Sequence, residues 1–223
     1  MMIPKIAYCM ILLPCLLPLN GSAQSNTHHY TTTLLRAAPG ELPDLLDRLK
    51  SEREELRGNL LIMRHSQGDH WDVMLLRPFD GIDLPDYGDF ADYQHDFIVS
   101  TDVSWDSLKS AGSASGLYHI EMFHARRGHY DALLKQRRME NAYYGEIGDD
   151  GNVIFETRFG SDVDIYTVGF YENMVDFAEQ PDLPPSAFDA AARAAGFTSQ
   201  ADLGFSLRRH ILRHNDTLAT PVE

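Results

Sequence analysis

One pattern occurs twice in this chain, and it constrains the fold more than any other feature. Tyr118 to Gly128 reads as a strand closed by a glycine, and it aligns without a gap with Tyr30 to Gly40, which lies 88 residues earlier. An amphipathic helical pattern follows each copy. Farther along, Asp164 matches Asp72 at an offset of 92 residues. A period near 90 residues indicates duplication of a whole small domain, because solenoid repeats are shorter.

Hydrophobic periodicity predicts nearly the same order of elements in both copies. In the first copy we expect a strand over 30–37, a helix over 41–57, strands over 60–65 and 71–77, a loop over 78–89, a short helix over 90–98 and a linker over 100–115. In the second we expect a strand over 118–125, a helix over 129–141, an insertion over 142–150 and strands over 153–159 and 164–170. Beyond a linker at 181–185, one helix is expected over 186–195. A second helix, opened by a capping-box pattern at Ser199 and Asp202, is expected to run to about 214.

Residues 1–23 have the composition of a secretory signal peptide. Lys5 gives a positive start, residues 6–19 are an apolar run, and Gly21-Ser22-Ala23 supplies the small residues of a cleavage site. The run is short and broken by prolines, so it does not predict a transmembrane helix. We therefore expect the protein to be exported to a periplasm or the exterior, with cleavage near Ala23.

Charge and cysteine usage exclude several classes of partner. The chain of 223 residues has a formal net charge of −14, which repels nucleic acid and anionic lipid. Both cysteines, Cys9 and Cys15, lie in the predicted signal peptide. The mature chain would then have no disulfide, cysteine nucleophile or thiolate ligand. No later stretch is apolar enough to predict a membrane span.

The repeated unit resembles a known superfamily. The residues that carry the resemblance are 121–128 with the helix over 130–138, and the weaker copy 33–40 with 42–50. Two such units in one chain resemble the dimeric α/β-barrel superfamily, including its antibiotic-biosynthesis-monooxygenase-like and NIPSNAP-like families. The resemblance spans roughly residues 28–180. It implies two four-stranded sheets packed face to face, helices outside and a cavity between them. Members include cofactor-free monooxygenases, haem proteins and isomerases.

The expected architecture is α+β, with two fused ferredoxin-like repeats that pair as a pseudo-dimeric α/β barrel. The signal peptide would occupy 1–23, the first repeat and its linker 24–115, the second repeat 116–180, and a helical C-terminal tail 181–223. The two repeats would pair within the chain, and a homo-oligomer is also compatible with the sequence.

Strand alternation separates an apolar face from a more polar one in each predicted strand. The apolar faces are expected beneath the helices. In the second copy the polar face carries His119, Glu121, Glu156, Arg158, Asp164 and Tyr166, and the aligned positions of the first copy are Thr31, Thr33, Met63, His65, Asp72 and Met74. Two interpretations are open. The polar face is solvated, as on one side of many antiparallel sheets, or it lines a cavity between the sheets.

A lined cavity predicts binding of a small, partly apolar molecule. Whether the protein is an enzyme stays open; if it is, His119 or Glu121 would act as the base, with Arg158 and Tyr166 holding an oxyanion or polar end. The candidate ligand-binding residues are Arg158, Tyr166, Glu156, His65, Asp72 and Asp164. The equivalent pair of Asp72 and Asp164 also fits a structural role, in which each carboxylate accepts backbone hydrogen bonds at a hairpin mouth.

Two further functions are carried as alternatives: a non-catalytic interaction protein of the cell envelope whose cavity is filled by its own side chains, and a haem-binding protein using His119 or His65. The sequence identifies no cofactor. It also predicts no metal site, although His119, Glu121, His124 and His129 lie close together. Alternation puts only His119 and Glu121 on one face, and two ligands from one strand do not make a site without a residue from elsewhere.

Overall fold

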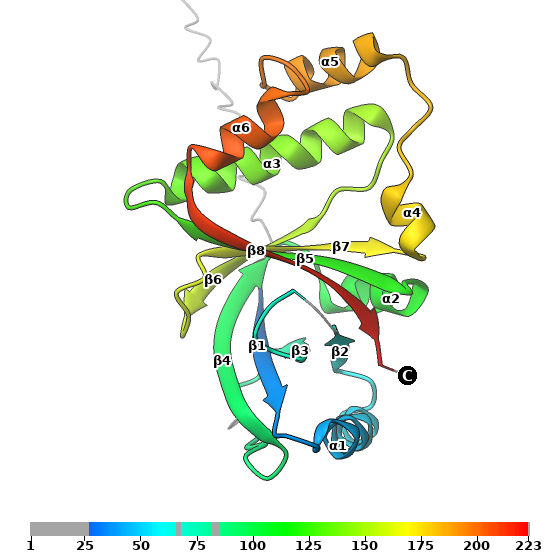
Figure 1. Ribbon diagram of the computed structural model, residues 1–223, viewed down its shortest axis with the longest axis vertical. Coiled ribbons are helices and arrows are strands. Elements are labelled where there is room, and N and C mark those ends of the chain that lie inside the picture. Colours follow the sequence, from blue (N-terminus) through cyan, green and yellow to red (C-terminus); the bar gives the residue numbers. More distant parts are fainter. Residues whose placement is uncertain (1–26, 66–67, 82–84, 223) are drawn as a thin grey trace, which may run out of the picture.

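Eight strands close into one barrel in the computed structural model, which describes residues 27–65, 68–81 and 85–222 (Figure 1). The predicted signal peptide lies outside the described residues. The strands are β1 (His28–Ala37), β2 (Leu61–Arg64), β3 (Val73–Pro78), β4 (Ala91–Thr101), β5 (Leu117–Ala125), β6 (Val153–Phe159), β7 (Ile165–Tyr171) and β8 (Ile211–Pro221). The helices are α1 (Leu42–Glu55), α2 (Trp105–Ala114), α3 (Tyr130–Ile147), α4 (Met174–Ala178), α5 (Pro185–Ala194) and α6 (Asp202–Arg208).

The barrel consists of two equivalent sheets from the two halves of the chain. The first has the strand order β4-β1-β3-β2 and the second β8-β5-β7-β6, and all neighbouring strands are antiparallel. Each is the order of a ferredoxin-like sheet. The seams join the halves, because β4 pairs with β6 and β2 pairs with β8. The expected fold class, with two repeats paired inside one chain, is confirmed.

Equivalent local interactions occur in the two halves, as the strand order does. Gly40 follows β1 with φ of 92°, and Gly128 follows β5 with φ of 77°, a backbone conformation that favours glycine. Asp72 accepts a hydrogen bond from the Ala37 amide at 2.9 Å, and Asp164 accepts one from the Ala125 amide at 2.7 Å. Each aspartate thus fastens the end of the first strand of its half to the hairpin that follows.

Side chains fill the inside of the barrel. The large residues Tyr30, Phe97 and Tyr166 are nearly or completely buried there, together with Trp71 and Phe155. The Tyr166 ring stacks on Phe155 with centroids 4.6 Å apart, and its hydroxyl shares a 2.8 Å hydrogen bond with Thr32. An eight-stranded barrel is just wide enough for side chains to fill it, so large apolar residues belong on the inward face.

The helices cover the outside. In Figure 1, α3 lies along one side of the β5–β7 sheet, α5 and α6 pack on α3, and α1 covers the first half. The apolar faces of β5 and β6, which were expected beneath the helices, face inward: Ile120, Met122 and Phe155 belong to the barrel core. In β7 the apolar face does lie outside as expected, because Ile165 packs against α3. The more polar faces of β5 and β6 lie outside, against α3. That part of the prediction was wrong, because the narrow interior demanded the bulkier apolar set.

Three predicted elements also differ from the structure. Residues 90–98 were expected to form a helix, but they belong mostly to β4, where Tyr93 and Phe97 alternate inward between polar neighbours. The expected linker at 100–115 contains α2. The last predicted helix ends at Arg208, and β8 follows as the fourth strand of the second sheet. The C-terminal segment is therefore part of the barrel. None of the described helices is both long and apolar enough to span a membrane.

Candidate functional site

The residues predicted for a site fall into separate groups. His119 and Glu121 stay together, as do Glu156 and Arg158, and both pairs lie on the outer surface of the second sheet beneath α3. Tyr166 faces the opposite way, into the core. Asp72 and Asp164 accept the two backbone hydrogen bonds described above. His65 is buried apart from both pairs, and its ring centroid lies 4.3 Å from that of Trp71 in an edge-on contact.

The first group surrounds the side chain of Arg137 and is called the His119 cluster: His119, Glu121, Asp216, Arg137 and Glu140. His119 Nε2 lies 2.5 Å from Asp216 Oδ1, and Arg137 Nη1 lies 3.4 Å from Glu121 Oε2. Arg137 also pairs with Glu140 one turn along α3. The Arg137 side chain is 2% exposed and its guanidinium lies over the Phe123 ring, 4.7 Å from the centroid. A charge so deeply buried needs the carboxylates around it.

Burial and charge act in opposite directions on the acid–base properties of this cluster. Burial opposes the charged form of His119, yet the hydrogen bond to Asp216 and the negative charge of Glu121 raise its pKa overall. The same hydrogen bond lowers the pKa of Asp216. For Glu121, burial raises the pKa, and Arg137 only partly offsets it. His119 and Asp216 therefore favour the charged ion pair, which makes His119 a poorer general base than a free imidazole.

The second group lines a pocket of about 620 Å³, here called the Arg138–Arg158 pocket. Its charged residues are Arg138 from α3, Arg158 and Glu156 from β6, and Asp102. Arg138 lies 3.6 Å and Arg158 lies 3.4 Å from Glu156 oxygens, while the Tyr130 hydroxyl donates to Glu156 at 2.8 Å. The other lining residues include Leu134, Val153 and Ile154 as apolar contacts and Asn141, Asn152 and Ser100 as polar ones.

The guanidinium groups of Arg138 and Arg158 are only partly occupied by ion pairs and hydrogen bonds. The Arg138 side chain is 65% exposed and that of Arg158 45%, and the two share one carboxylate. Arg158 Nε also donates to the Ser100 hydroxyl at 2.7 Å, which fixes its position. Guanidinium groups retain several donors after one such contact. The pocket thus combines unused cationic donors with an apolar surface.

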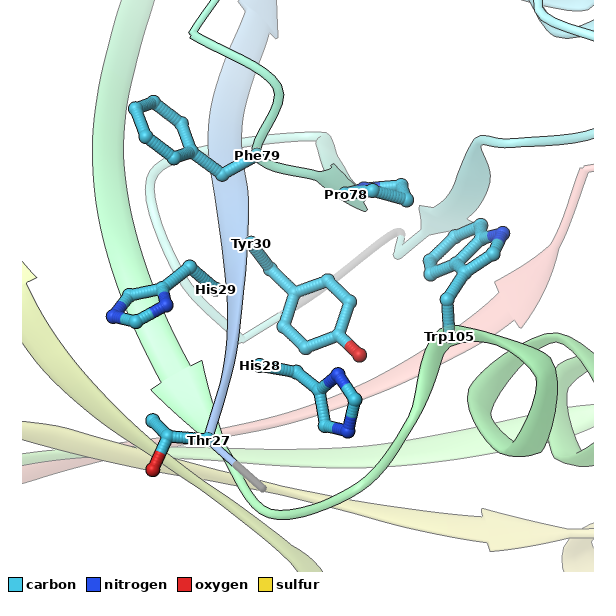
Figure 2. Close-up of a pocket in the computed structure, with 7 residues that line it drawn as sticks. All are labelled: Thr27, His28, His29, Tyr30, Pro78, Phe79 and Trp105. Atoms are coloured by element: carbon cyan, nitrogen blue, oxygen red, sulfur yellow. The ribbon is translucent and has the colours of Figure 1, made fainter.

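A second pocket, of about 500 Å³, lies at the start of β1 and is shown in Figure 2. Tyr30, His28 and Trp105 lie on one side of the strand, and His29 and Phe79 on the other. The Tyr30 hydroxyl donates to the Val103 carbonyl at 2.7 Å. None of the residues predicted for a site lines this pocket. Its aromatic character was not singled out in the sequence.

The two histidines considered for haem binding lie in different settings. His119 is outside the barrel and paired with Asp216, while His65 is buried against Trp71. Tyr143, from the predicted insertion over 142–150, is buried against α5 in a cluster with Ala192.

Sequence reasoning missed Asp216, Arg137 and Arg138 as members of these groups. Asp216 lies in a segment expected to be helical or terminal, yet β8 pairs it with Glu121. Arg137 lies in the helix predicted over 129–141, but one of its partners, Glu121, comes from β5. Residues 214–219 show no alternation of apolar and polar side chains, so hydrophobic periodicity gave no signal for β8.

Comparisons with known proteins agree with the fold. An anthrone oxidase-like protein superposes with a TM-score of 0.58 and 9% sequence identity, covering 88% of this chain and 92% of its own. A candidate chlorite dismutase superposes with a TM-score of 0.51 and 13% sequence identity, and the match covers 88% of this chain and 95% of that protein. No family model matches the chain, and no curated protein matches it. The likeness to these structures shows the fold alone: this is a dimeric α/β barrel with both halves in one polypeptide.

Proposed function

We propose that this protein binds a small, partly apolar molecule with an anionic end in the Arg138–Arg158 pocket. The observation that carries the proposal is the convergence of two half-exposed guanidinium groups on the single carboxylate of Glu156 at the wall of the pocket. A carboxylate or phosphate on the ligand would accept from Arg138 and Arg158, as such groups do in bidentate recognition. The apolar part would lie against Leu134, Val153 and Ile154.

Location and volume also support this pocket over the others. Proteins bind small molecules in concave, mostly apolar sites with a few convergent polar groups. The interior of the barrel, where the cavity was expected, is filled by its own side chains. The pocket in Figure 2 has no comparable pair of cations, and its Tyr30 hydroxyl is already bonded. Two residues predicted from the sequence, Glu156 and Arg158, line the preferred pocket.

Matched probes test the charge requirement. Hexanoate and its neutral analogue hexanamide are titrated into the purified protein, and binding is followed by amide NMR shifts. Hexanoate should bind more tightly and shift the amides of Asn152 and Val153. In Arg158→Gln we expect its affinity to fall by about 10- to 100-fold, since a charge-assisted hydrogen bond contributes about 1.5–3 kcal/mol. Arg193→Gln, on an exposed part of α5, is the control and should bind normally. Equal affinity for both probes would refute the proposal.

We also propose that the protein is exported. Lys5, the apolar run over residues 6–19 and the small residues before Gln24 support this proposal. The test is mass spectrometry of the protein recovered from the extracytoplasmic fraction of a bacterial host. The mature chain should begin at Gln24, and Ala23→Tyr should leave the precursor uncleaved. Recovery of uncleaved wild-type protein from the cytoplasm alone would contradict export.

The filled barrel favours one alternative, a non-catalytic interaction protein of the envelope. Core side chains such as Phe155 and Tyr166 fill the space between the sheets. If no small anionic or neutral probe perturbs the Arg138–Arg158 pocket, the interaction protein becomes the better hypothesis.

A further inference from the structure

Three potential metal ligands meet on the outer surface of the second sheet. His119 and Glu121 come from β5, and Asp216 comes from β8, where it stands directly opposite Glu121 in the strand register. One ligand atom from each of the three lies within 4.8 Å of those of the other two. Among the described residues this is the only such group of histidine, cysteine and acidic side chains. The tertiary structure thus supplies the third ligand that the sequence of β5 lacks.

Charge in the His119 cluster is unbalanced. Glu121, Glu140 and Asp216 contribute three carboxylates, whereas Arg137 contributes one guanidinium. A metal ion bound at His119 displaces the imidazolium proton, and these five residues then carry a net charge of −2. The Glu121 and Glu140 side chains are only 12% and 15% exposed, so water screens that charge poorly. A divalent cation matches this charge.

We propose that His119, Glu121 and Asp216 bind a divalent first-row transition-metal ion. One imidazole nitrogen and two carboxylate oxygens suit Zn²⁺ or Mn²⁺ better than Mg²⁺ or Ca²⁺, which prefer oxygen ligands alone. Ligands at about 2.1 Å from a tetrahedral ion stand about 3.4 Å from one another, so shifts of roughly 1 Å convert the present arrangement into a site. Three protein ligands leave at least one coordination position open.

The surroundings support a site with access to solvent. The Asp216 side chain is 55% exposed, which gives an ion a route of entry and leaves room for a water ligand. On the buried side, Arg137 and the Thr167 hydroxyl contact Glu121 Oε2 at 3.4 and 3.3 Å. Contacts of that kind orient a ligating carboxylate. The other Glu121 oxygen is the one we assign to the ion.

The protein contains a matched control in a second histidine–aspartate pair. His70 Nδ1 lies 2.6 Å from Asp69 Oδ1, much as His119 lies against Asp216. No third ligand joins His70 and Asp69 within the described residues. A comparison of the two pairs therefore separates a metal site from an ordinary ion pair.

Isothermal titration with ZnCl₂ after chelator treatment tests the proposal, and the electron paramagnetic resonance signal of added MnCl₂ gives a second readout. Wild type should bind one Zn²⁺ per chain. Affinity should fall by about tenfold or more in His119→Ala and Asp216→Asn, because even residues that only support a ligand have effects of that size. His70→Ala should bind as wild type does. Circular dichroism establishes that each variant is folded, and Asp216→Asn provides a near-isosteric change should His119→Ala fail to fold.

The outcomes separate cleanly. One Zn²⁺ per chain, weakened by both cluster variants and unaffected by His70→Ala, supports the site. Absence of stoichiometric Zn²⁺ and Mn²⁺ binding by the folded wild type overturns it. So does equal binding by wild type and Asp216→Asn, or a loss that follows His70 in place of His119. The site is independent of the Arg138–Arg158 pocket, so hexanoate binding should survive in Asp216→Asn if that separate proposal holds.

Discussion

Replacing Arg137 by methionine should destabilise the fold strongly. The side chain is 2% exposed and pairs with both Glu121 and Glu140. Methionine fills much of the same space and still covers the Phe123 ring, so the main loss is electrostatic. Breaking a buried ion pair by removing one partner costs about 3–5 kcal/mol, because the remaining carboxylates stay buried without a counter-charge. For a protein of this size that corresponds to a fall in Tm of roughly 10 °C.

The neighbouring arginine provides the control. Arg138 follows Arg137 in α3, but its side chain is 65% exposed and its ion pair with Glu156 is long, at 3.6 Å. Arg138→Met should therefore cost less than about 1 kcal/mol, as exposed pairs do. Urea denaturation of wild type and both variants measures the difference. A loss below about 1 kcal/mol in Arg137→Met would refute the reasoning, since it would place the Glu121 carboxylate in a well-solvated environment.

A double-mutant cycle assigns the effect to its partner. Glu121→Gln removes the negative charge but keeps an acceptor for the Thr167 hydroxyl, which now contacts Glu121 Oε2. In the Arg137→Met/Glu121→Gln double variant less charge is left without a partner, although Glu140 remains. The double variant should therefore be about 0.5–3 kcal/mol more stable than the sum of the single losses predicts, the range measured for residues in contact. Simple additivity would mean that Glu140 alone balances Arg137.

Two further predictions concern other parts of the fold. Asp72→Ala and Asp164→Ala should each cost about 1.5–3 kcal/mol in urea denaturation, because each removes a charged acceptor from an equivalent backbone amide; strongly unequal losses would argue against equivalent roles. Burial, with repulsion from His129 and nearby arginines, lowers the pKa of His210. The folded state thus binds this proton less readily than the unfolded chain, so stability falls as pH drops through about 6.5. His210→Gln should flatten that decline, and NMR titration of the His210 ring should give a pKa below its usual value.

Several features followed from local sequence signals. The repeat of strand, glycine and amphipathic helix predicted both β1–α1 and β5–α3, and the glycines at 40 and 128 have the positive φ that such turns favour. The matched aspartates 72 and 164 occupy equivalent positions in the structure. These features depend on residues that are near one another in the chain or on a comparison of the two copies, and both can be read from the sequence alone.

Other features required partners that are distant in the sequence. His119, Glu121, Glu156 and Arg158 were grouped with Tyr166 on one face that would line a cavity, but only Tyr166 faces inward. Strand alternation gives two faces and does not say which one a barrel encloses. Most of β4 was predicted as a helix because its inward residues Tyr93 and Phe97 stand four apart, a spacing that fits both the helical and the strand period. The missed strand β8 has the same explanation, since a stripe through Leu203 and Leu207 continues to Ile211 at helical spacing.

By itself the sequence determined the duplication and the order of most elements, because hydrophobic period and repeat spacing are local properties. The pairing of the two halves was what the resemblance to the dimeric α/β-barrel superfamily implied. Only the tertiary structure decided where the polar residues lie. Closure into eight strands left an interior that bulky apolar side chains fill, and this placed His119 and Glu121 outside, against α3. It also brought Asp216 to them from nearly a hundred residues away, through the pairing of β8 with β5. A ligand set assembled across strands is fixed by register, which no stretch of sequence contains alone.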